Sequence, residues 1–231
     1  MTLRLPGLYA VTPDGLPEAE LLARVEQSLA AGVRLLQYRA KPAGAAGRAA
    51  DGSARPGEAV ARAIAAACRA AGAWLIVNDD PRLAAALGAH GVHLGRDDGT
   101  VAQAREHVGP ALVGVSCYDS LDRAVQAEAE GADYVAFGAM FPSRVKPGAV
   151  RASPALLAQA RARLRVPVVA IGGIDLGNAA GVLRAGAHSL AVISAVYSAP
   201  DIGDAVRRFK EIIETETRSP PAADAAGSDQ P

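Results

Sequence analysis

"PEAELLARVEQSLAAGVRLLQYRAK", residues 17 to 41, joins a helical pattern directly to a strand pattern. Apolar residues recur with a helical period up to Gly32, a residue suited to the left-handed conformation that ends many helices. The apolar run VRLLQYR, residues 33–39, follows at once and is typical of a buried strand. Helix, glycine and buried strand therefore form one unit, and the fold depends on how often this unit recurs.

The unit recurs along most of the chain. The predicted strands are residues 8–12, 33–39, 74–79, 91–95, 112–117, 133–138, 167–173 and 189–194. Amphipathic segments such as 57–72, 121–131 and 153–164 lie between them. Many of the helical segments end in a glycine just before the next strand: Gly32, Gly72, Gly109, Gly131 and Gly186. This alternation predicts a parallel sheet covered by helices.

A chain with eight such units is most economically an α/β protein folded as a closed (β/α)8 TIM barrel with parallel strands. An open doubly wound sheet is the alternative. It is disfavoured because the first strand is not followed by G-x-G-x-x-G and because polar residues recur at the ends of nearly all strands.

With 231 residues and 50% hydrophobic content, the chain can bury one large core or two small ones. The eight repeated units favour a single barrel domain over residues 1–217. Residues 42–57, PAGAAGRAADGSARPG, lack periodicity and predict a flexible insertion after the second strand. In a barrel this insertion lies at the active face, either as a lid or as a tolerated loop. Residues 218–231 have no apolar period and predict a disordered tail.

The charge balance argues against two classes of partner. Lys plus Arg equals Asp plus Glu at 24 each, so no net field attracts nucleic acid or a membrane surface. The N-terminal residues lack the pattern of a secretory signal. Cys68 and Cys117 have no disulfide-like or zinc-like spacing, and we expect both to be buried packing residues. The sequence predicts a soluble cytoplasmic protein and leaves its oligomeric state open, a homo-oligomer included.

The end of the second predicted strand, LLQYRAK (residues 35–41), carries polar side chains at alternate positions. Because alternate residues of a strand share a face, Gln37, Arg39 and Lys41 should lie on the same face as Leu35. We expect this face to leave the barrel interior and reach the end at which the strands finish. The intervening residues should turn toward the helices: Leu36, Tyr38 and Ala40.

Other predicted strands also end in polar residues, and in a parallel barrel these ends meet at one rim. The further candidates are Asn78, Asp79, Asp97, Asp98, Ser116, Ser143, Lys146, Gly172, Gly173, Ile193 and Ser194. The opposite ends carry mostly small or helix-capping residues. The rim is therefore where we expect the functional site.

Two anion sites are expected there. The turns AIGGI and VISAV after strands seven and eight supply backbone N–H groups, which in such barrels commonly hold a phosphate monoester. A tight turn that requires positive φ is the alternative explanation for the two glycines.

The second anion site combines three cations with two carboxylates: Arg39, Lys41, Lys146, Asp79 and Asp98. Any single pair among them is more simply an ordinary salt bridge. As a set they suit a diphosphate and a Mg²⁺, because Mg²⁺ is usually bound by one or two carboxylates together with substrate phosphates. Asp97 is a reserve candidate.

Other chemistries find little support. The segment GVSCY lacks the second glycine of a nucleophile elbow, and no Ser-His-Asp or Cys-His set is visible. His90 and His93 are three residues apart on a strand, so they face opposite sides and do not form a metal pair; His93 suits a core or strand-end role. A diphosphate, a metal and a second phosphate pocket favour displacement of diphosphate.

The chain resembles the thiamine phosphate synthase family. The motifs LYAVT, LLQYRAK, IVNDD, GVHLGRDD, VGVSCYDS, GADYVAFGAMFPSRVKPGA, VVAIGGI and AVISAV occur in the family's order between residue 7 and about residue 210. This family joins hydroxymethylpyrimidine diphosphate to a thiazole phosphate and releases diphosphate.

The resemblance implies a role for each matching residue. Gln37, Arg39, Lys41 and Asn78 contact the pyrimidine diphosphate, and Asp79 and Asp98 hold the Mg²⁺. Ser116 assists at the pyrimidine and diphosphate, with Ser143 and Lys146 near the leaving group and the thiazole. The thiazole phosphate binds at Gly173, Ile193 and Ser194. Arg39, Lys41, Ser116 and Lys146 are the expected catalytic residues.

The chain departs from the family at three places. Ala40 stands where a glutamate is usual, but it alternates off the site face. Val145 stands where a hydroxyl is usual, which removes one possible hydrogen bond to substrate. The third departure is the insertion at 42–57. Two other functions remain open: a thiazole tautomerase, expected to use a histidine where this chain has CYDS, and a catalytically silent phosphate-binding barrel.

Overall fold

The computed structural model describes residues 3–40, 57–142 and 151–218. Its strands are β1 (Leu8–Val11), β2 (Leu35–Tyr38), β3 (Trp74–Asn78), β4 (Gly91–Leu94), β5 (Leu112–Tyr118), β6 (Tyr134–Phe137), β7 (Val168–Ile171) and β8 (Ser189–Val192). They pair in sequence order, all parallel, and β8 closes the sheet on β1. The prediction of a closed parallel barrel is confirmed, and the open doubly wound sheet is excluded.

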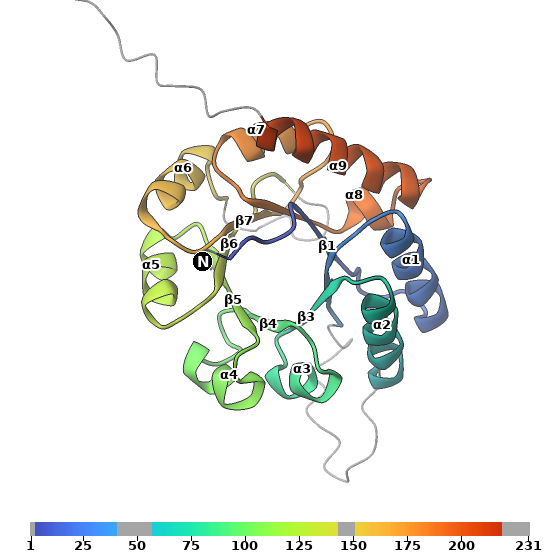
Figure 1. Cartoon of the computed structure of the whole chain (residues 1–231). Helices are drawn as coiled ribbons and strands as arrows, with labels where there is room; N and C mark the ends of the chain where they lie inside the picture. Colours follow the sequence, from blue (N-terminus) through green and yellow to red (C-terminus); the bar gives the residue numbers. More distant parts are fainter. Residues whose placement is uncertain (1–2, 41–56, 143–150, 219–231) are drawn as a thin grey trace, which may run out of the picture.

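Helices surround this barrel, as Figure 1 shows. They are α1 (Glu18–Ala30), α2 (Glu58–Ala70), α3 (Pro81–Leu87), α4 (Val101–Val108), α5 (Leu121–Ala129), α6 (Pro154–Arg163), α7 (Ala179–Arg184), α8 (Ser194–Tyr197) and α9 (Ile202–Arg218). The last helix includes Arg218, the first residue of the expected tail. The remainder of that tail, and the expected insertion except Gly57, lie outside the described residues.

Local signals explain where several helices begin and end. The side chains of four N-cap residues accept a hydrogen bond from the backbone N–H three positions on: Asp80, Thr100, Ser120 and Ser153. The five glycines expected to end helices all have positive φ. Strand β7 ends at Ile171 rather than at residue 173, because Gly172 and Gly173 turn the chain with φ of 98° and 67°.

The buried side chains form two layers. Most lie between the sheet and the helices, including Leu36, Tyr38 and both cysteines, Cys68 and Cys117. A smaller cluster fills the barrel interior: Tyr9, Val11, Leu35, Ile76, Tyr134, Ala136, Val169 and Ala191. The two layers follow from the alternation of side chains along each strand. None of the described helices is long and apolar enough to cross a membrane.

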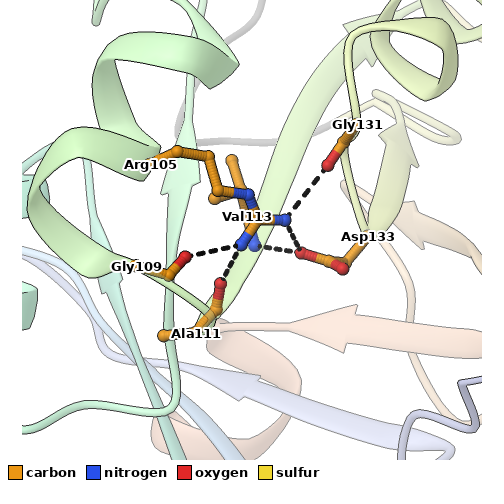
Figure 2. A network of polar contacts seen from close by, with 6 residues as sticks. All are labelled: Arg105, Gly109, Ala111, Val113, Gly131 and Asp133. Carbon is orange, nitrogen blue, oxygen red and sulfur yellow. Dashed lines mark hydrogen bonds and ion pairs between the residues drawn. The ribbon is translucent and has the colours of Figure 1, made fainter.

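At the amino-terminal end of β5, Arg105 of α4 ties two loops together (Figure 2). Its guanidinium donates to the carbonyl oxygens of Gly109, Ala111 and Gly131 and pairs with Asp133 at 2.5 Å. The same Asp133 oxygen accepts from the N–H of Val113 at 2.7 Å. This end of the barrel is thus held by a polar network far from the strand ends that carry the candidate site.

Candidate active site

The closed parallel barrel places most of the candidate residues at one end, which we call the mouth. This end carries the carboxyl termini of all eight strands. The described candidates that lie in the last residues of a strand or follow its end are Gln37, Arg39, Asn78, Asp79, Asp98, Ser116, Gly173, Ile193 and Ser194. Three expected residues lie outside the described part of the chain: Lys41, Ser143 and Lys146. Val145 does too.

Gln37 lies inside the barrel near the mouth. It is 4% exposed, and it follows Leu35 of the interior cluster by two residues. Leu36 and Tyr38 pack in the outer layer instead. The expected division of β2 into an interior and a helix-facing side is therefore confirmed from Leu35 to Tyr38.

Arg39 is held by two residues from the segment after β1, neither of which the sequence analysis singled out. The Thr12 hydroxyl donates to the carbonyl oxygen of Arg39 at 3.0 Å and accepts from the N–H of Arg39 at 2.8 Å. The guanidinium forms an ion pair with Asp14, and the Arg39 side chain is 13% exposed. Both partners come from the segment after β1, so this segment positions Arg39.

Asp79 and Asp98 approach the same point above β4. A Cβ atom at Gly95 would lie 2.5 Å from Oδ2 of Asp98 and 3.9 Å from Oδ1 of Asp79. The Asp98 carboxylate also accepts from the N–H of Gly95 at 2.8 Å. Because Gly95 has no side chain, it leaves room for both carboxylates. Asp97, the reserve candidate, is exposed, whereas Asp98 is half-buried.

This carboxylate pair fits a hard divalent cation. Within the described residues, no three His, Cys, Asp or Glu side chains are grouped as a metal site. A Mg²⁺ at Asp79 and Asp98 would therefore take its other ligands from phosphate oxygens and water, which is the arrangement Mg²⁺ favours.

A chain of hydrogen-bonded side chains crosses the barrel beneath the mouth. The Gln37 amide donates to the Tyr9 hydroxyl at 2.8 Å, and that hydroxyl lies 2.9 Å from the hydroxyl of Tyr134. The Tyr134 hydroxyl lies 3.2 Å from Nδ1 of His93, whose Nε2 lies 2.8 Å from Oγ of Ser116. We call these five residues the interior chain. It links two expected site residues, Gln37 and Ser116, through three residues from other strands.

The interior chain is uncharged at neutral pH. Burial raises the pKa of the Tyr9 and Tyr134 hydroxyls and lowers the pKa of His93 to about 4, although Asp98 partly opposes the last shift. The imidazole of His93 also stacks on the ring of Tyr134, with centroids 5.6 Å apart. His93 is thus a buried neutral imidazole.

The expectation that His90 and His93 do not form a metal pair is confirmed. Nδ1 of His90 accepts from the N–H of Leu75, and its ring stacks on Trp74 at the opposite end of the strands. The sequence assigned His93 a core or strand-end role but did not pair it with Tyr9 or Tyr134. Inward alternation in LYAVT and DYVAFG was the available signal for the two tyrosines.

Arg123 of α5 braces the neighbouring strand end. Its Nε donates to the carbonyl oxygen of Ser116 at 2.8 Å, and Nη2 donates to that of Gly95 at 3.4 Å. The guanidinium also lies over the ring of Tyr118. One helical side chain therefore ties Ser116 to the loop after β4, which carries Asp98.

The residues expected to bind a phosphate lie at the carboxyl ends of β7 and β8. Ile171 pairs with Ala191, so Gly173 and Ile193 each follow that pair by two residues. The loop after β6 donates to this turn, from the N–H of Phe141 to the carbonyl oxygen of Gly172. Among the residues that the structure describes, the N–H groups of Gly173 and Ser194 have no hydrogen-bond acceptor. Free N–H groups of this kind suit an anion.

Comparisons with known proteins show the family to which this chain belongs. Residues 8–196 match the family described as thiamine monophosphate synthase. The thiamine-phosphate synthase of Methylococcus capsulatus is 48% identical over 95% of both chains. That of an Azoarcus species is 56% identical over 86% of this chain and 92% of its own.

A solved structure of a relative has the same fold. The thiamine phosphate pyrophosphorylase from Pyrococcus furiosus superposes with a TM-score of 0.76 and 31% identity, covering 90% of this chain and 96% of its own. The chain therefore belongs to the thiamine monophosphate synthase family, and its activity is that of a transferase in thiamine biosynthesis, the formation of thiamine phosphate.

Proposed function

We propose that this enzyme condenses 4-amino-2-methyl-5-hydroxymethylpyrimidine diphosphate with 4-methyl-5-(2-phosphoethyl)thiazole, using Mg²⁺ held by Asp79 and Asp98. The bond between the pyrimidine methylene carbon and the diphosphate oxygen breaks, and its electron pair leaves with diphosphate. The thiazole nitrogen then supplies the electron pair of the new carbon–nitrogen bond. The observation that carries the proposal is the approach of both carboxylates to Gly95, beside the strand end that bears Ser116.

The bound cation would neutralise charge on the diphosphate as that group departs. The protein's own residues then bind and orient. Arg39 and Ser116 contact the leaving diphosphate, with Lys41 and Lys146 as further cations, and Gln37 and Asn78 hold the pyrimidine. Gly173, Ile193 and Ser194 bind the thiazole phosphate through backbone N–H groups, and Ser143, which lies outside the described residues, is assigned to the thiazole by the family resemblance. Charge-assisted contacts to phosphate oxygens are the strongest hydrogen bonds available to such a site.

The ion pair between Arg39 and Asp14 supports the proposal that Arg39 contacts the diphosphate. Its guanidinium pairs with Asp14 and is mostly buried at the mouth. A diphosphate oxygen offers the same kind of charge-assisted contact as the Asp14 carboxylate. We infer that Asp14 holds the guanidinium in place until substrate binds.

The direct test mixes both substrates with the protein and measures thiamine phosphate and diphosphate, with Mg²⁺ or with EDTA. We expect the two products in equal amounts and only with Mg²⁺. Asp79→Asn and Asp98→Asn should each lower kcat about 100-fold or more, because each removes a ligand charge. Asp97→Asn serves as the matched control, since the neighbouring carboxylate is exposed, and it should retain activity. Unchanged turnover in both ligand variants would refute the metal assignment.

Gly95→Ala is a sharper test of the same pair. The new methyl group would displace the Asp98 carboxylate, since it would lie 2.5 Å from Oδ2. We expect the Mg²⁺ concentration for half-maximal activity to rise about 10-fold, in line with the effect of moving groups that orient metal ligands. Calorimetric titration of Gly95→Ala with Mg²⁺ in the presence of diphosphate should show a similar loss of Mg²⁺ affinity, and this measurement does not depend on turnover.

A further inference from the structure

The direction of the interior chain follows from where its hydrogen atoms can go. The Gln37 amide donates to the Tyr9 oxygen, so the Tyr9 hydrogen needs another acceptor. The Tyr134 oxygen, at 2.9 Å, provides it. The Tyr134 hydrogen then goes to Nδ1 of His93, and the single imidazole hydrogen must sit on Nε2. Nε2 accordingly donates to Oγ of Ser116.

The opposite direction leaves a buried hydrogen unpaired. If Ser116 donated to His93 and His93 to Tyr134, both Gln37 and Tyr134 would donate to the Tyr9 oxygen. The Tyr9 hydrogen would then have no acceptor among the described residues, at a tyrosine that is 1% exposed. An unsatisfied buried donor is strongly disfavoured relative to a paired one. The forward direction gives an acceptor to the hydroxyl hydrogens of Tyr9 and Tyr134 and to the imidazole hydrogen of His93.

We propose that His93 is a positioning residue: as the Nε2–H imidazole it donates to Ser116 and thereby turns the Ser116 hydroxyl hydrogen out toward the substrate at the mouth. Ser116 is then a hydrogen-bond donor to the diphosphate ester rather than an acceptor. The inference rests on the role proposed above for Ser116. It adds that Gln37 and two tyrosines, Tyr9 and Tyr134, determine which way this hydroxyl points.

The geometry of the surrounding residues keeps Ser116 in this position. The Nε–H group of Arg123 donates to the Ser116 carbonyl oxygen at 2.8 Å, which anchors the backbone at this residue. The chain ends at the half-buried Ser116, whose hydroxyl has one hydrogen left to donate. Because successive hydrogen bonds polarise one another, a donor at the end of such a chain is strengthened. Its contact should matter most as negative charge develops on the departing diphosphate.

The first test reads the tautomer directly. ¹⁵N NMR of protein labelled in its 4 histidines should show His93 as the neutral Nε2–H form at pH 7.5, with the signal assigned by its absence in His93→Gln. Tyr134→Phe removes the donor to Nδ1 while keeping the stacked ring, and it should change the His93 signal. Finding His93 in the Nδ1–H form in the wild type would overturn the proposal.

The second test asks whether His93 acts through Ser116. Tyr134→Phe should lower kcat about 10-fold, the loss expected for one hydrogen bond, with KM changed less than about twofold. Tyr197→Phe is the matched control: this buried hydroxyl contacts Ser28 of α1 instead, at 3.2 Å, and kcat should not change. In a Ser116→Ala background, Tyr134→Phe should have almost no further effect.

The outcomes separate this inference from the proposed function. A 10-fold loss that persists in the Ser116→Ala background would show that Tyr134 acts through the structure alone and would overturn the positioning role. Unchanged kcat in Ser116→Ala would overturn it as well. A wild-type protein that releases no diphosphate from the two substrates would instead contradict the proposed function, whatever the tautomer of His93.

Discussion

The ring of Tyr134 occupies the space that a side chain on Gly114 would fill. The two residues are paired in register on neighbouring strands. A Cβ atom at Gly114 would therefore lie only 2.0 Å from Cζ of that ring. Glycine at this position of β5 therefore makes room for the central tyrosine of the interior chain.

Gly114→Ala should destabilise the protein by about 3 kcal/mol or more, because an extra methyl group in a packed interior forces side chains and backbone apart. The measurement is the urea unfolding midpoint at unchanged m-value. Gly181→Ala is the matched control. Gly181 lies in α7 with nothing within 4 Å of its Cβ position, so alanine there should be neutral or slightly stabilising. Equal stability of both variants would contradict the packing argument.

Thr12→Val should disturb the position of Arg39 while leaving its side chain intact. Valine has nearly the shape of threonine but neither donates to the carbonyl oxygen of Arg39 nor accepts from its N–H. We expect kcat/KM for the pyrimidine diphosphate to fall about 10-fold and stability to fall by about 1–3 kcal/mol, the range for stranded buried polar groups. Thr12→Ser keeps the hydroxyl and should restore most of the activity. A serine variant as impaired as the valine variant would contradict the role given to the hydroxyl.

Arg105→Met should lower stability by about 1–3 kcal/mol, because three carbonyl oxygens and Asp133 lose their common donor (Figure 2). The strands separate this network from the mouth, so kcat at saturating substrate should stay within about twofold. Arg184→Met provides the control, since the Arg184–Glu216 pair is largely exposed on the arginine side and should contribute less than about 1 kcal/mol. A large loss of kcat in Arg105→Met would contradict the separation.

Acid should destabilise the protein through His93. Its pKa is about 4 in the folded protein, because of burial, and about 6.5 in the unfolded chain, so the unfolded state binds more protons below pH 6.5. Stability is therefore complete above pH 6.5 and is lost as the pH falls toward 4, by about 2 kcal/mol at pH 5. Urea midpoints of wild type and His93→Gln, measured without Mg²⁺ at pH 7.5 and 5, isolate this contribution. The difference in urea midpoint between the two proteins should be smaller at pH 5 than at pH 7.5. An equal difference at both pH values would contradict the contribution of His93.

The alternation of residues within each strand was readable from the sequence. The order of Leu35, Leu36, Gln37 and Tyr38 predicted which side chains enter the barrel, and the structure has them that way. Helix ends were equally readable where a single residue decides them, as at Gly32, with φ of 108°. Local patterns of this kind depend on backbone sterics and on the two- or 3.6-residue period of each element.

The side-chain partners of the candidate site residues could not be read from the sequence. Arg39 pairs with Asp14 rather than with Asp79 or Asp98, and no local pattern distinguishes these carboxylates. The sequence nevertheless placed Asp79 and Asp98 together correctly at the mouth, because both follow neighbouring strands of a parallel barrel.

By itself, the sequence determined the eightfold unit, the closed barrel and the end at which the candidate residues gather, since each depends on short-range periodicity repeated along the chain. Tertiary structure alone decided that Tyr9 reaches Tyr134, 125 residues away, and that His93 joins them to Ser116. Those contacts depend on the register and closure of the whole sheet, which bring residues from β1, β2, β4, β5 and β6 into one small interior.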